Sequence, residues 1–194
     1  MEQVLSVKAE KLGRHLEQEG LVTEGTEEIR RLILENYEFV PRDAAEVDAS
    51  FRQIIPYVLI RKDGKFLLTE RLKKQTETRL HGKLSLGTGG HIDPADTVSG
   101  DVLQTGLERE LTEEVFVEKT LDMRFLGIIN DYSSEVSFYH LGLLYLLDAD
   151  GDVHIRETGK MTGRFVPPAE LTELTEYMET WSQVVFKALD FKNL

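Results

Sequence analysis

Three glutamates share one short segment of the chain, Arg109-Glu110-Leu111-Thr112-Glu113-Glu114. In a helix, residues three and four positions apart lie on one side, so Glu110, Glu113 and Glu114 would place their carboxylates on a common patch. Like charges at this spacing repel one another, and no lysine follows in this segment before Lys119. Because Mg²⁺ favours one or two carboxylates together with substrate phosphates, the segment predicts a site for a hard divalent cation. The alternative is an acidic helix face that is simply solvated.

An apolar stripe and a glycine-rich loop could hold the acidic patch in place. Leu103, Leu107, Leu111 and Val115 recur every four residues, so a helix here can bury one side while its acids face a cleft. Residues 87–90, Gly-Thr-Gly-Gly, precede the helix, and glycine lets backbone groups approach an ion more closely than a larger side chain would. The segment therefore predicts a glycine loop followed by a packed helix that presents its carboxylates.

The same segment resembles the Nudix box. That pattern is a glycine, five residues, an acid and seven residues, followed by Arg-Glu-apolar-x-Glu-Glu-x-Gly-apolar. Gly90 matches the opening glycine, Asp96 stands at the position of the first acid, and residues 109–114 match the core without a gap. Twelve residues rather than seven follow Asp96 before the arginine, so Asp101 is an alternative for that acid. Phe116 replaces the second glycine, so the chain must leave the helix without glycine's freedom at positive φ.

This resemblance implies a metal-dependent hydrolase. As a family, Nudix enzymes use divalent cations, here Mg²⁺ or Mn²⁺, to hydrolyse a nucleoside diphosphate linked to another moiety by attack of water on phosphorus. The resemblance implies that Glu110, Glu113, Glu114 and the Gly90 carbonyl hold the metal, and that Arg109 orients Glu110. One of the carboxylates, or a hydroxide bound to the metal, would take the proton of the attacking water.

Family members often recruit a further acid from a loop after the central strands. Glu157 is the best candidate, because it lies eight residues before Phe165, where the family commonly carries an aromatic on a late strand. Glu135 is a rival, and an exposed loop acid is the alternative reading of Glu157. The implied catalytic set is therefore Arg109, Glu110, Glu113 and Glu157.

Three residues are candidates for contacts with the substrate. Arg79 precedes the glycine loop and could meet a phosphate, although a solvated charge explains it equally well. His91 follows Gly90 and could donate to a phosphate or make a structural hydrogen bond. Tyr132 lies roughly where diadenosine polyphosphate hydrolases carry a tyrosine. We therefore expect a small phosphorylated or nucleotide substrate, but these residues do not identify the compound.

Composition limits the alternatives. The chain has 194 residues, 41% of them hydrophobic, which suits one packed domain with an extension. Its net charge of −12 argues against a nucleic-acid polymer as partner. No signal-like or membrane-spanning apolar run is present, so we expect a cytoplasmic protein that is not bound to a membrane. A Nudix domain that senses nucleotides without turnover is a second hypothesis, although such domains usually lose box acids. A protein resembling isopentenyl diphosphate isomerase is a third, but that mechanism needs a cysteine and the chain has none.

Strand signals dominate the part of the chain around the box. Residues 54–60 and 65–69 flank an Asp-Gly turn, which predicts a hairpin, and Pro56 predicts an edge or an irregularity in its first strand. Further strands are expected at 123–129 and 138–147, with a turn at 148–151 before another strand. Antiparallel pairs with helices around them predict an α/β protein, a sandwich with a mixed sheet. That is also the Nudix-type α/β/α sandwich, and the resemblance covers about residues 51–175.

Residues 1–50 are predicted to form a mainly helical N-terminal extension to a Nudix domain at 51–194 that ends in a helix. Thr26 could begin a helix that buries Ile29, Leu32 and Ile33, and an earlier helix could use Leu5, Leu12 and Leu16. Packing against the domain is the expected role of this extension, and a homodimer interface is an alternative role.

Overall fold

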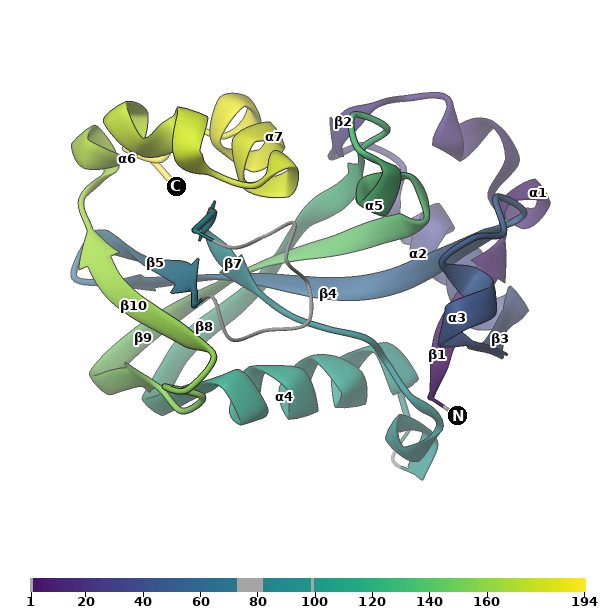
Figure 1. Ribbon diagram of the computed structural model, residues 1–194, viewed down its shortest axis with the longest axis horizontal. Coiled ribbons are helices and arrows are strands. Elements are labelled where there is room, and N and C mark those ends of the chain that lie inside the picture. The colour runs from purple at the N-terminus through teal and green to yellow at the C-terminus, as the bar shows by residue number, and fades with distance from the viewer. Residues whose placement is uncertain (1, 73–81, 99) are drawn as a thin grey trace.

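The structure is a computed structural model that describes residues 2–72, 82–98 and 100–194. Figure 1 shows a long sheet with α4 on one face and α6 and α7 on the other. The described strands are β1 (Gln3–Lys8), β2 (Gly20–Val22), β3 (Tyr37–Pro41), β4 (Phe51–Lys62), β5 (Lys65–Arg71), β6 (Leu84–Ser85), β7 (Gly87–Thr88), β8 (Val115–Asn130), β9 (His140–Ile155) and β10 (Met161–Val166). The described α-helices are α1 (Ala9–Leu12), α2 (Thr26–Asn36), α3 (Arg42–Ala45), α4 (Val102–Glu114), α5 (Glu135–Phe138), α6 (Pro168–Leu174) and α7 (Thr180–Ala188).

The sheet is mixed, as predicted. Its main order is β10-β5-β4-β9-β8-β2, with β4 and β9 parallel and the other neighbours in this order antiparallel. The predicted hairpin joins β4 to β5 through Asp63 and Gly64, whose φ angles of 50° and 70° are both positive. Two positive φ angles suit the tight hairpin turn that favours Asp-Gly. The predicted hairpin and mixed-sheet α/β sandwich are therefore confirmed.

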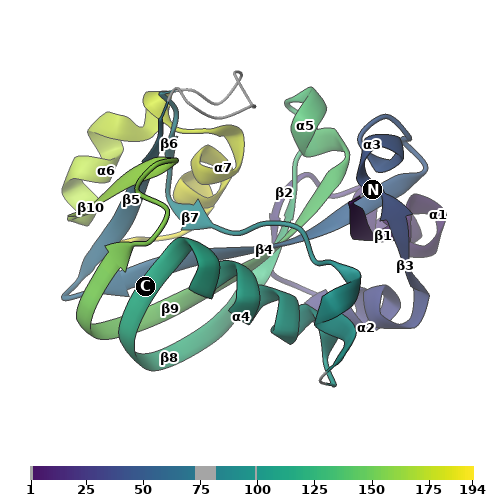
Figure 2. The same ribbon diagram turned by 60° about the horizontal axis from the view of Figure 1, so that its bottom comes forward.

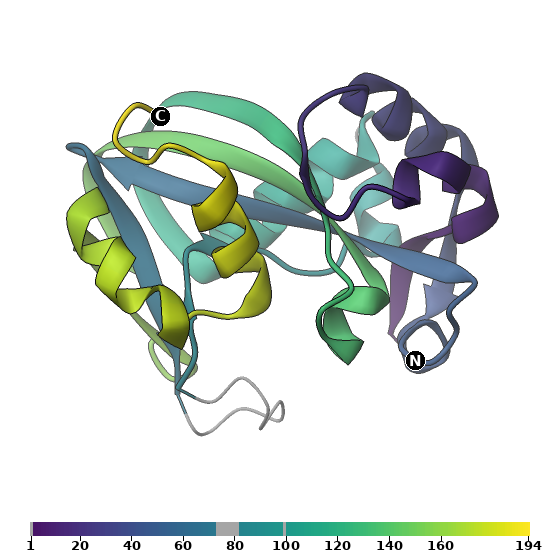
Figure 3. The ribbon, with the colours of Figure 1, turned by 90° about the horizontal axis from the view of Figure 1, so that it is seen from above.

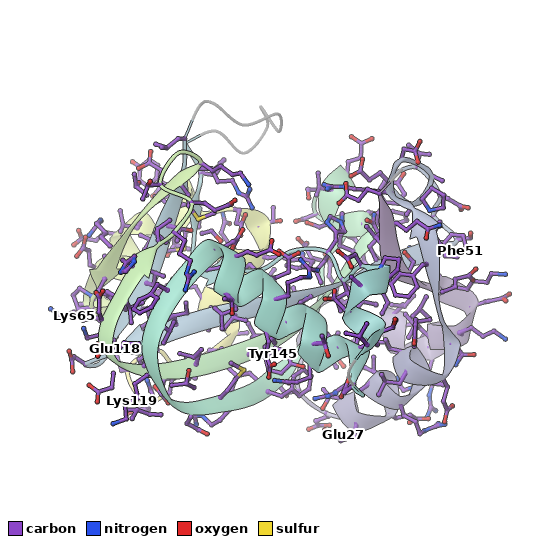
Figure 4. All side chains as sticks on the ribbon, turned by 90° about the horizontal axis from the view of Figure 1, so that it is seen from below. Glu27, Phe51, Lys65, Glu118, Lys119 and Tyr145 are labelled. Carbon is purple, nitrogen blue, oxygen red and sulfur yellow. The ribbon has the colours of Figure 1, made fainter. Side chains whose placement is uncertain are left out.

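Strand β4 runs through the centre of the molecule and is buried on both faces. Its side chains alternate between two hydrophobic clusters, one on the side of α4 and one on the side of α7. Figure 4 shows Phe51 and Lys65, near the two ends of the β4–β5 hairpin, at opposite ends of the molecule, with α4 lying across the sheet between them. The β4 residues of the α4-side cluster are Ile54, Val58 and Ile60, and those of the α7-side cluster are Ile55, Tyr57 and Leu59.

One edge of β4 has an interruption that positions the glycine loop. The beginning of β4 pairs with β1 at Gln53, and pairing with β7 starts only at Val58. Pro56, which has no N–H to donate, lies in this interval, as the predicted irregularity requires. Here the loop passes so close to β4 that a Cβ on Gly89 would overlap the carbonyl oxygen of Pro56. Glycine is therefore required for the loop to cross the sheet at this point.

The N-terminal segment combines helices with strands that the sequence did not predict. Helix α2 is confirmed, with Ile29 and Ile33 buried. The earlier helix is confirmed only in part: Leu12 lies in α1 and Leu16 in the short 3₁₀-helix that follows. Its extension to Leu5 is wrong, because Leu5 lies in β1, which pairs with β3 and β4. Residues Val4 to Val7 are all fully buried between these neighbours, and the spacing of the leucines alone could not distinguish this arrangement from a helix. Figure 3 shows this segment gathered at one end of the molecule. The division between residues 1–50 and 51–194 stays a prediction.

The turn predicted at residues 148–151 is also wrong. These residues lie inside β9, which continues to Ile155 in one long pairing with β8. Two register shifts in that pairing, at 117–119 and 120–122 of β8, and the positive φ of Gly151, 74°, accommodate the turn-like sequence without ending the strand. None of the described helices is long and apolar enough to cross a membrane.

Candidate active site

Helix α4 carries the acidic patch as predicted. Asp101 caps its start, because its carboxylate accepts hydrogen bonds from the backbone N–H groups of Leu103 and Gln104 at 2.9 and 3.4 Å. The apolar stripe faces the core, and Figure 2 shows α4 in front of the sheet, after the loop that follows β7. The helix ends directly in β8 at Val115, whose φ of −131° is extended. Phe116 is therefore a strand residue, and no glycine is needed to leave the helix.

Arg109 is the centre of an ion-pair network at the middle of α4. Its guanidinium donates to both carboxylate oxygens of Asp96 at 2.8 Å and to the carbonyl oxygen of His91 at 2.9 Å. It also donates to Glu110 at 2.7 Å. The bonds that Arg109 donates to Asp96 first, and then its bond to Glu110, raise the pKa of Arg109. Burial opposes ionisation of Asp96, but the bonds from Arg109 outweigh it and lower the pKa of that carboxyl. Asp96, rather than Asp101, is the acid that joins the network.

Glu110 is held between this arginine and the glycine loop. One of its oxygens accepts from Arg109, and a Cβ on Gly90 would overlap the other. Burial raises the pKa of Glu110, while its contact with Arg109 opposes the rise. A larger residue at position 90 would displace this carboxylate, so Gly90 and Glu110 depend on each other's position.

Glu114 faces a cavity on the other side of the glycine loop. Its carboxylate accepts from the backbone N–H of Gly89 at 3.2 Å. Burial raises the pKa of Glu114 to about 7; the positive charge of Arg71 opposes the rise, and the negative charges of Glu110 and Glu157 add to it. The cavity is lined by Tyr57, Thr69, Arg71, Ser85, Gly87, Thr88, Gly89, Glu114, Met161 and Glu179.

These acids match a hard divalent cation in the chemistry of their oxygen donors. Glu110 and Glu114 lie against the loop on which Gly90 presents its backbone. Burial raises the pKa of both carboxyls, and the negative charge of Glu110 adds to the rise at Glu114, so a bound cation would relieve the cost of ionising them. Glu113 is 57% exposed and accepts from Arg109 at 3.4 Å. In the described ranges no three acidic or histidine side chains already converge as metal ligands. Binding would therefore require the Glu113 side chain to turn toward the loop.

Glu157 lies close enough to the acidic patch for its charge to act on Glu114. Its carboxylate forms an ion pair with Lys160, whose pKa rises first because of that bond and further because of the charges of Glu114 and Glu113. The rival acid, Glu135, lies in α5, which Figure 1 shows on the opposite side of the sheet from α4. The structure therefore brings Glu157, and not Glu135, to the acids of α4.

The predicted substrate contacts are not gathered at the acids. Arg79 lies outside the described residues. The His91 ring contacts Gln53 at 2.9 Å, and burial lowers its pKa to about 3, so the ring is uncharged near neutral pH. The hydroxyl of Tyr132 donates to the carbonyl oxygen of Leu16 at 2.7 Å. Both side chains make structural hydrogen bonds in this arrangement.

Sequence reasoning missed several residues of the cavity. Arg71 ends β5 and is paired in register with Met161 of β10, next to Lys160. Tyr57 is fully buried; its hydroxyl donates to Glu179 at 2.8 Å and receives the backbone N–H of Gly87 at 3.1 Å. Arg71 lies two residues beyond the strand predicted at 65–69, and no local pattern there indicated a place in the cavity. Nothing near Glu179 in the sequence indicates its place, since packing of α7 brings it there.

Comparison with known proteins decides the family. A model of the NUDIX domain matches residues 50–189 of the chain. The chain belongs to the Nudix family. Protein YmaB of Bacillus subtilis (strain 168) is 36% identical over 171 residues, which cover 84% of this chain and 83% of YmaB. Family membership supports hydrolase activity of the general Nudix kind.

Solved structures agree with this assignment. The crystal structure of Tm1382 matches with a TM-score of 0.85 and 32% identity over 99% of both chains. DR0079 from Deinococcus radiodurans matches with a TM-score of 0.57 and 17% identity, over 88% of this chain and 98% of that one. The NUDIX domain of Shewanella oneidensis NrtR, solved with ADP ribose, matches with a TM-score of 0.54 and 16% identity, over 70% of this chain and 84% of that one. The last two show the fold alone. Because the match with Tm1382 covers 99% of this chain, it includes the N-terminal strands, so these strands are part of the fold that the two proteins share.

Proposed function

We propose that this Nudix protein hydrolyses the pyrophosphate bond of a nucleoside diphosphate linked to another moiety. The observation that carries the proposal is the placement of Glu110 and Glu114 against the Gly89-Gly90 loop, with burial raising the pKa of both carboxyls. Buried acids that repel one another beside a cavity are poorly explained as a solvated helix face. They are well explained as a site for a cation and a phosphorylated substrate.

The chain's own residues have separable parts in this reaction. A divalent cation, Mg²⁺ or Mn²⁺, held by Glu110, Glu113, Glu114 and the Gly90 carbonyl would supply positive charge to the phosphate oxygens. Arg109 keeps the Glu110 carboxylate oriented through the bonds already described. Attack of water forms one P–O bond and breaks the bridging P–O bond, and we assign Glu157 to accept the water's proton.

Arg71 is the proposed contact for the substrate's phosphates. It lines the cavity beside Glu114, and an arginine fork matches phosphate oxygens. Arg71→Gln should raise KM by about 10- to 100-fold with a smaller change in kcat, since one charge-assisted hydrogen bond is worth roughly 1.5–3 kcal/mol. Arg164→Gln is the matched control, because Arg164 on the neighbouring strand β10 pairs with Glu170 instead. Equal KM values for the two variants would remove Arg71 from the binding site.

The direct test is a substrate panel with Mg²⁺ or Mn²⁺. It should contain dinucleoside polyphosphates, nucleotide sugars and ADP-ribose, the last chosen because of the ligand of the NrtR domain. We expect release of a monophosphate from at least one compound, with label from isotopic water found in a phosphate product. Glu113→Gln and Glu114→Gln should lower turnover by orders of magnitude in folded protein. Inactivity over the whole panel would instead favour a nucleotide sensor, and near-normal rates of both variants would refute the metal ligands.

A further inference from the structure

One charged side chain of the cavity has no part in the proposed reaction. Among the residues that the structure describes, three charged ones line the cavity: Arg71, Glu114 and Glu179. Glu114 ends α4, whereas Glu179 lies at the start of α7, and Figure 1 shows these two helices on opposite faces of the sheet. The cavity therefore has a carboxylate from each face, and only the one on α4 belongs to the proposed metal site.

Hydroxyl groups hold the carboxylate of Glu179 in place. Its Oε1 atom accepts hydrogen bonds from the Tyr57 hydroxyl at 2.8 Å and from the Ser85 hydroxyl at 2.5 Å. Burial, and then the charge of Glu179, raise the pKa of Tyr57, so this hydroxyl stays protonated and donates. The backbone N–H of Glu179 donates to the carbonyl oxygen of Leu84 at 2.9 Å. Both the side chain and the backbone of Glu179 are therefore tied to the segment that leads into the glycine loop.

No cation neutralises this carboxylate in the described part of the chain. Other acids that are largely withdrawn from solvent pair with an arginine, Asp96 with Arg109 and Asp148 with Arg61. Among the described residues, no lysine or arginine forms an ion pair with Glu179. A charge that is partly withdrawn from water and has no partner is unfavourable, so its presence in the cavity requires an explanation.

Repulsion of further negative charge provides that explanation. The cavity has a volume of about 30 Å³, room for about two groups the size of a water molecule, so a group that enters lies close to all three charged side chains. Arg71 attracts phosphate, whereas Glu179 repels it. Like charges that a binding site brings together lower the affinity for the wrong ligand. Because hydrogen bonds fix Glu179, its side chain cannot turn away to relieve the repulsion.

We propose that Glu179 restricts the substrate to two phosphates between its end groups. The inference rests on the proposed function, and it narrows the substrate class to diphosphates by excluding tri- and tetraphosphates. A diphosphate would contact Arg71 and the cation held by the acids of α4. A third phosphate would extend further into the cavity, toward the uncompensated carboxylate of Glu179.

Binding of inorganic phosphates tests this proposal without catalysis. The full chain, with Mg²⁺ in excess, should be titrated by calorimetry with pyrophosphate and with tripolyphosphate. We expect wild type to bind pyrophosphate at least about 10-fold more tightly, as repulsion between two nearby charges in a partly solvated site predicts. Attraction to Mg²⁺ and Arg71 alone would favour tripolyphosphate, which carries more charge. Equal affinities, or tighter binding of tripolyphosphate, would overturn the proposal, and this comparison needs no variant.

Glu179→Gln assigns the effect to one charge. Glutamine keeps an oxygen that can accept from Tyr57 and Ser85, so the substitution removes the charge and preserves the hydrogen bonds. We expect the affinity for tripolyphosphate to rise by about 10-fold and that for pyrophosphate to change by less than about 3-fold. Glu176→Gln is the matched control, because Glu176 is exposed, lies three residues earlier and does not line the cavity. An equal gain in both variants would show an effect of net charge alone and would overturn the proposal.

Turnover of two matched compounds separates this role of Glu179 from the proposed reaction. Diadenosine diphosphate and diadenosine triphosphate differ by one phosphate. We expect wild type to prefer the diphosphate in kcat/KM, and Glu179→Gln to reduce that preference by about 10-fold. Turnover with the same preference in both proteins would overturn the role of Glu179 and leave the hydrolase standing. The expected affinities for inorganic phosphates, without turnover of any compound, would support the role of Glu179 while the hydrolase proposal fails.

Discussion

Replacing Glu114 by glutamine should stabilise the protein in the absence of divalent cations. Glutamine keeps the size of the side chain and an oxygen that can accept from the N–H of Gly89, which now lies 3.2 Å from the carboxylate. What the substitution removes is the negative charge beside Glu110 and Glu157. The proposed metal site therefore predicts a gain in stability together with a loss of activity.

The magnitude follows from the pKa of Glu114, which burial raises from 4.5 to about 7. A pKa difference of about 2.5 corresponds to a change of at most roughly 3 kcal/mol in the free energy of unfolding. Screening by solvent at the cavity mouth reduces this change to about 1–2 kcal/mol. The folded state binds the proton more tightly than the unfolded state, so wild-type stability falls as pH rises from 4.5 through 7. Below pH 4.5 the carboxyl is protonated in both states, and this difference from the glutamine variant vanishes.

The assay is urea denaturation at several values between pH 4.5 and 8 in EDTA, followed by Trp181 fluorescence. The free energy of unfolding of Glu114→Gln should exceed that of wild type by about 1–2 kcal/mol at pH 8 and equal it near pH 4.5. Glu113→Gln is the control, because that side chain is 57% exposed and its replacement should change stability by no more than about 0.5 kcal/mol. Excess Mg²⁺ should stabilise wild type more than Glu114→Gln. A glutamine variant that is less stable at pH 8, or a difference independent of pH, would refute the reasoning.

Two further substitutions test the supports of the acids. Gly90→Ala would push a Cβ into the Glu110 carboxylate, so it should lower kcat by about 100-fold and weaken Mg²⁺ binding, which calorimetry measures. Gly159→Ala is the control: Gly159 has open space around it, so this variant should change neither kcat nor Mg²⁺ affinity. Asp96→Asn removes the charge that Nε and Nη2 of Arg109 contact, and should cost about 2–4 kcal/mol of unfolding free energy because the arginine loses a buried charged partner. Wild-type metal affinity in the alanine variant, or an unchanged denaturation midpoint in the asparagine variant, would count against these roles.

The sequence could predict what depends on local spacing. The stripe Leu103, Leu107 and Leu111 predicted α4 and its buried face, and the turn at Asp63 predicted the β4–β5 hairpin. Both patterns act within a few residues, so they do not require knowledge of distant partners. The acids of α4 and the glycine loop could be found for the same reason, because each lies within one continuous segment.

The remaining features depend on contacts between distant segments. Leu5 is compatible with a helix until pairing with β3 and β4 is known. Arg71, at the end of β5, and Glu179, at the start of α7, both line the cavity at Glu114, although neither is near Glu114 in the sequence. Such cavity residues come from separate elements, and no local signal distinguishes them from other charged residues. The sequence therefore predicts the acids and glycine loop of the proposed metal site more completely than the cavity residues proposed to bind the substrate.

In the lengthened Nudix box, a contact between distant residues shows which aspartate stands at the position of the first acid. Asp96 and Asp101 were both candidates for the first acid, and the structure gives each its own contact. Asp101 caps α4, while Asp96 lies in a short 3₁₀-helix, residues 94–98, and pairs with Arg109. Gly106 makes this possible, since a Cβ there would come 2.7 Å from the Ile92 side chain and 3.1 Å from the Asp96 carboxylate. The extra residues therefore lengthen the path to the helix start, while a glycine inside the helix preserves the ion pair that orients Glu110.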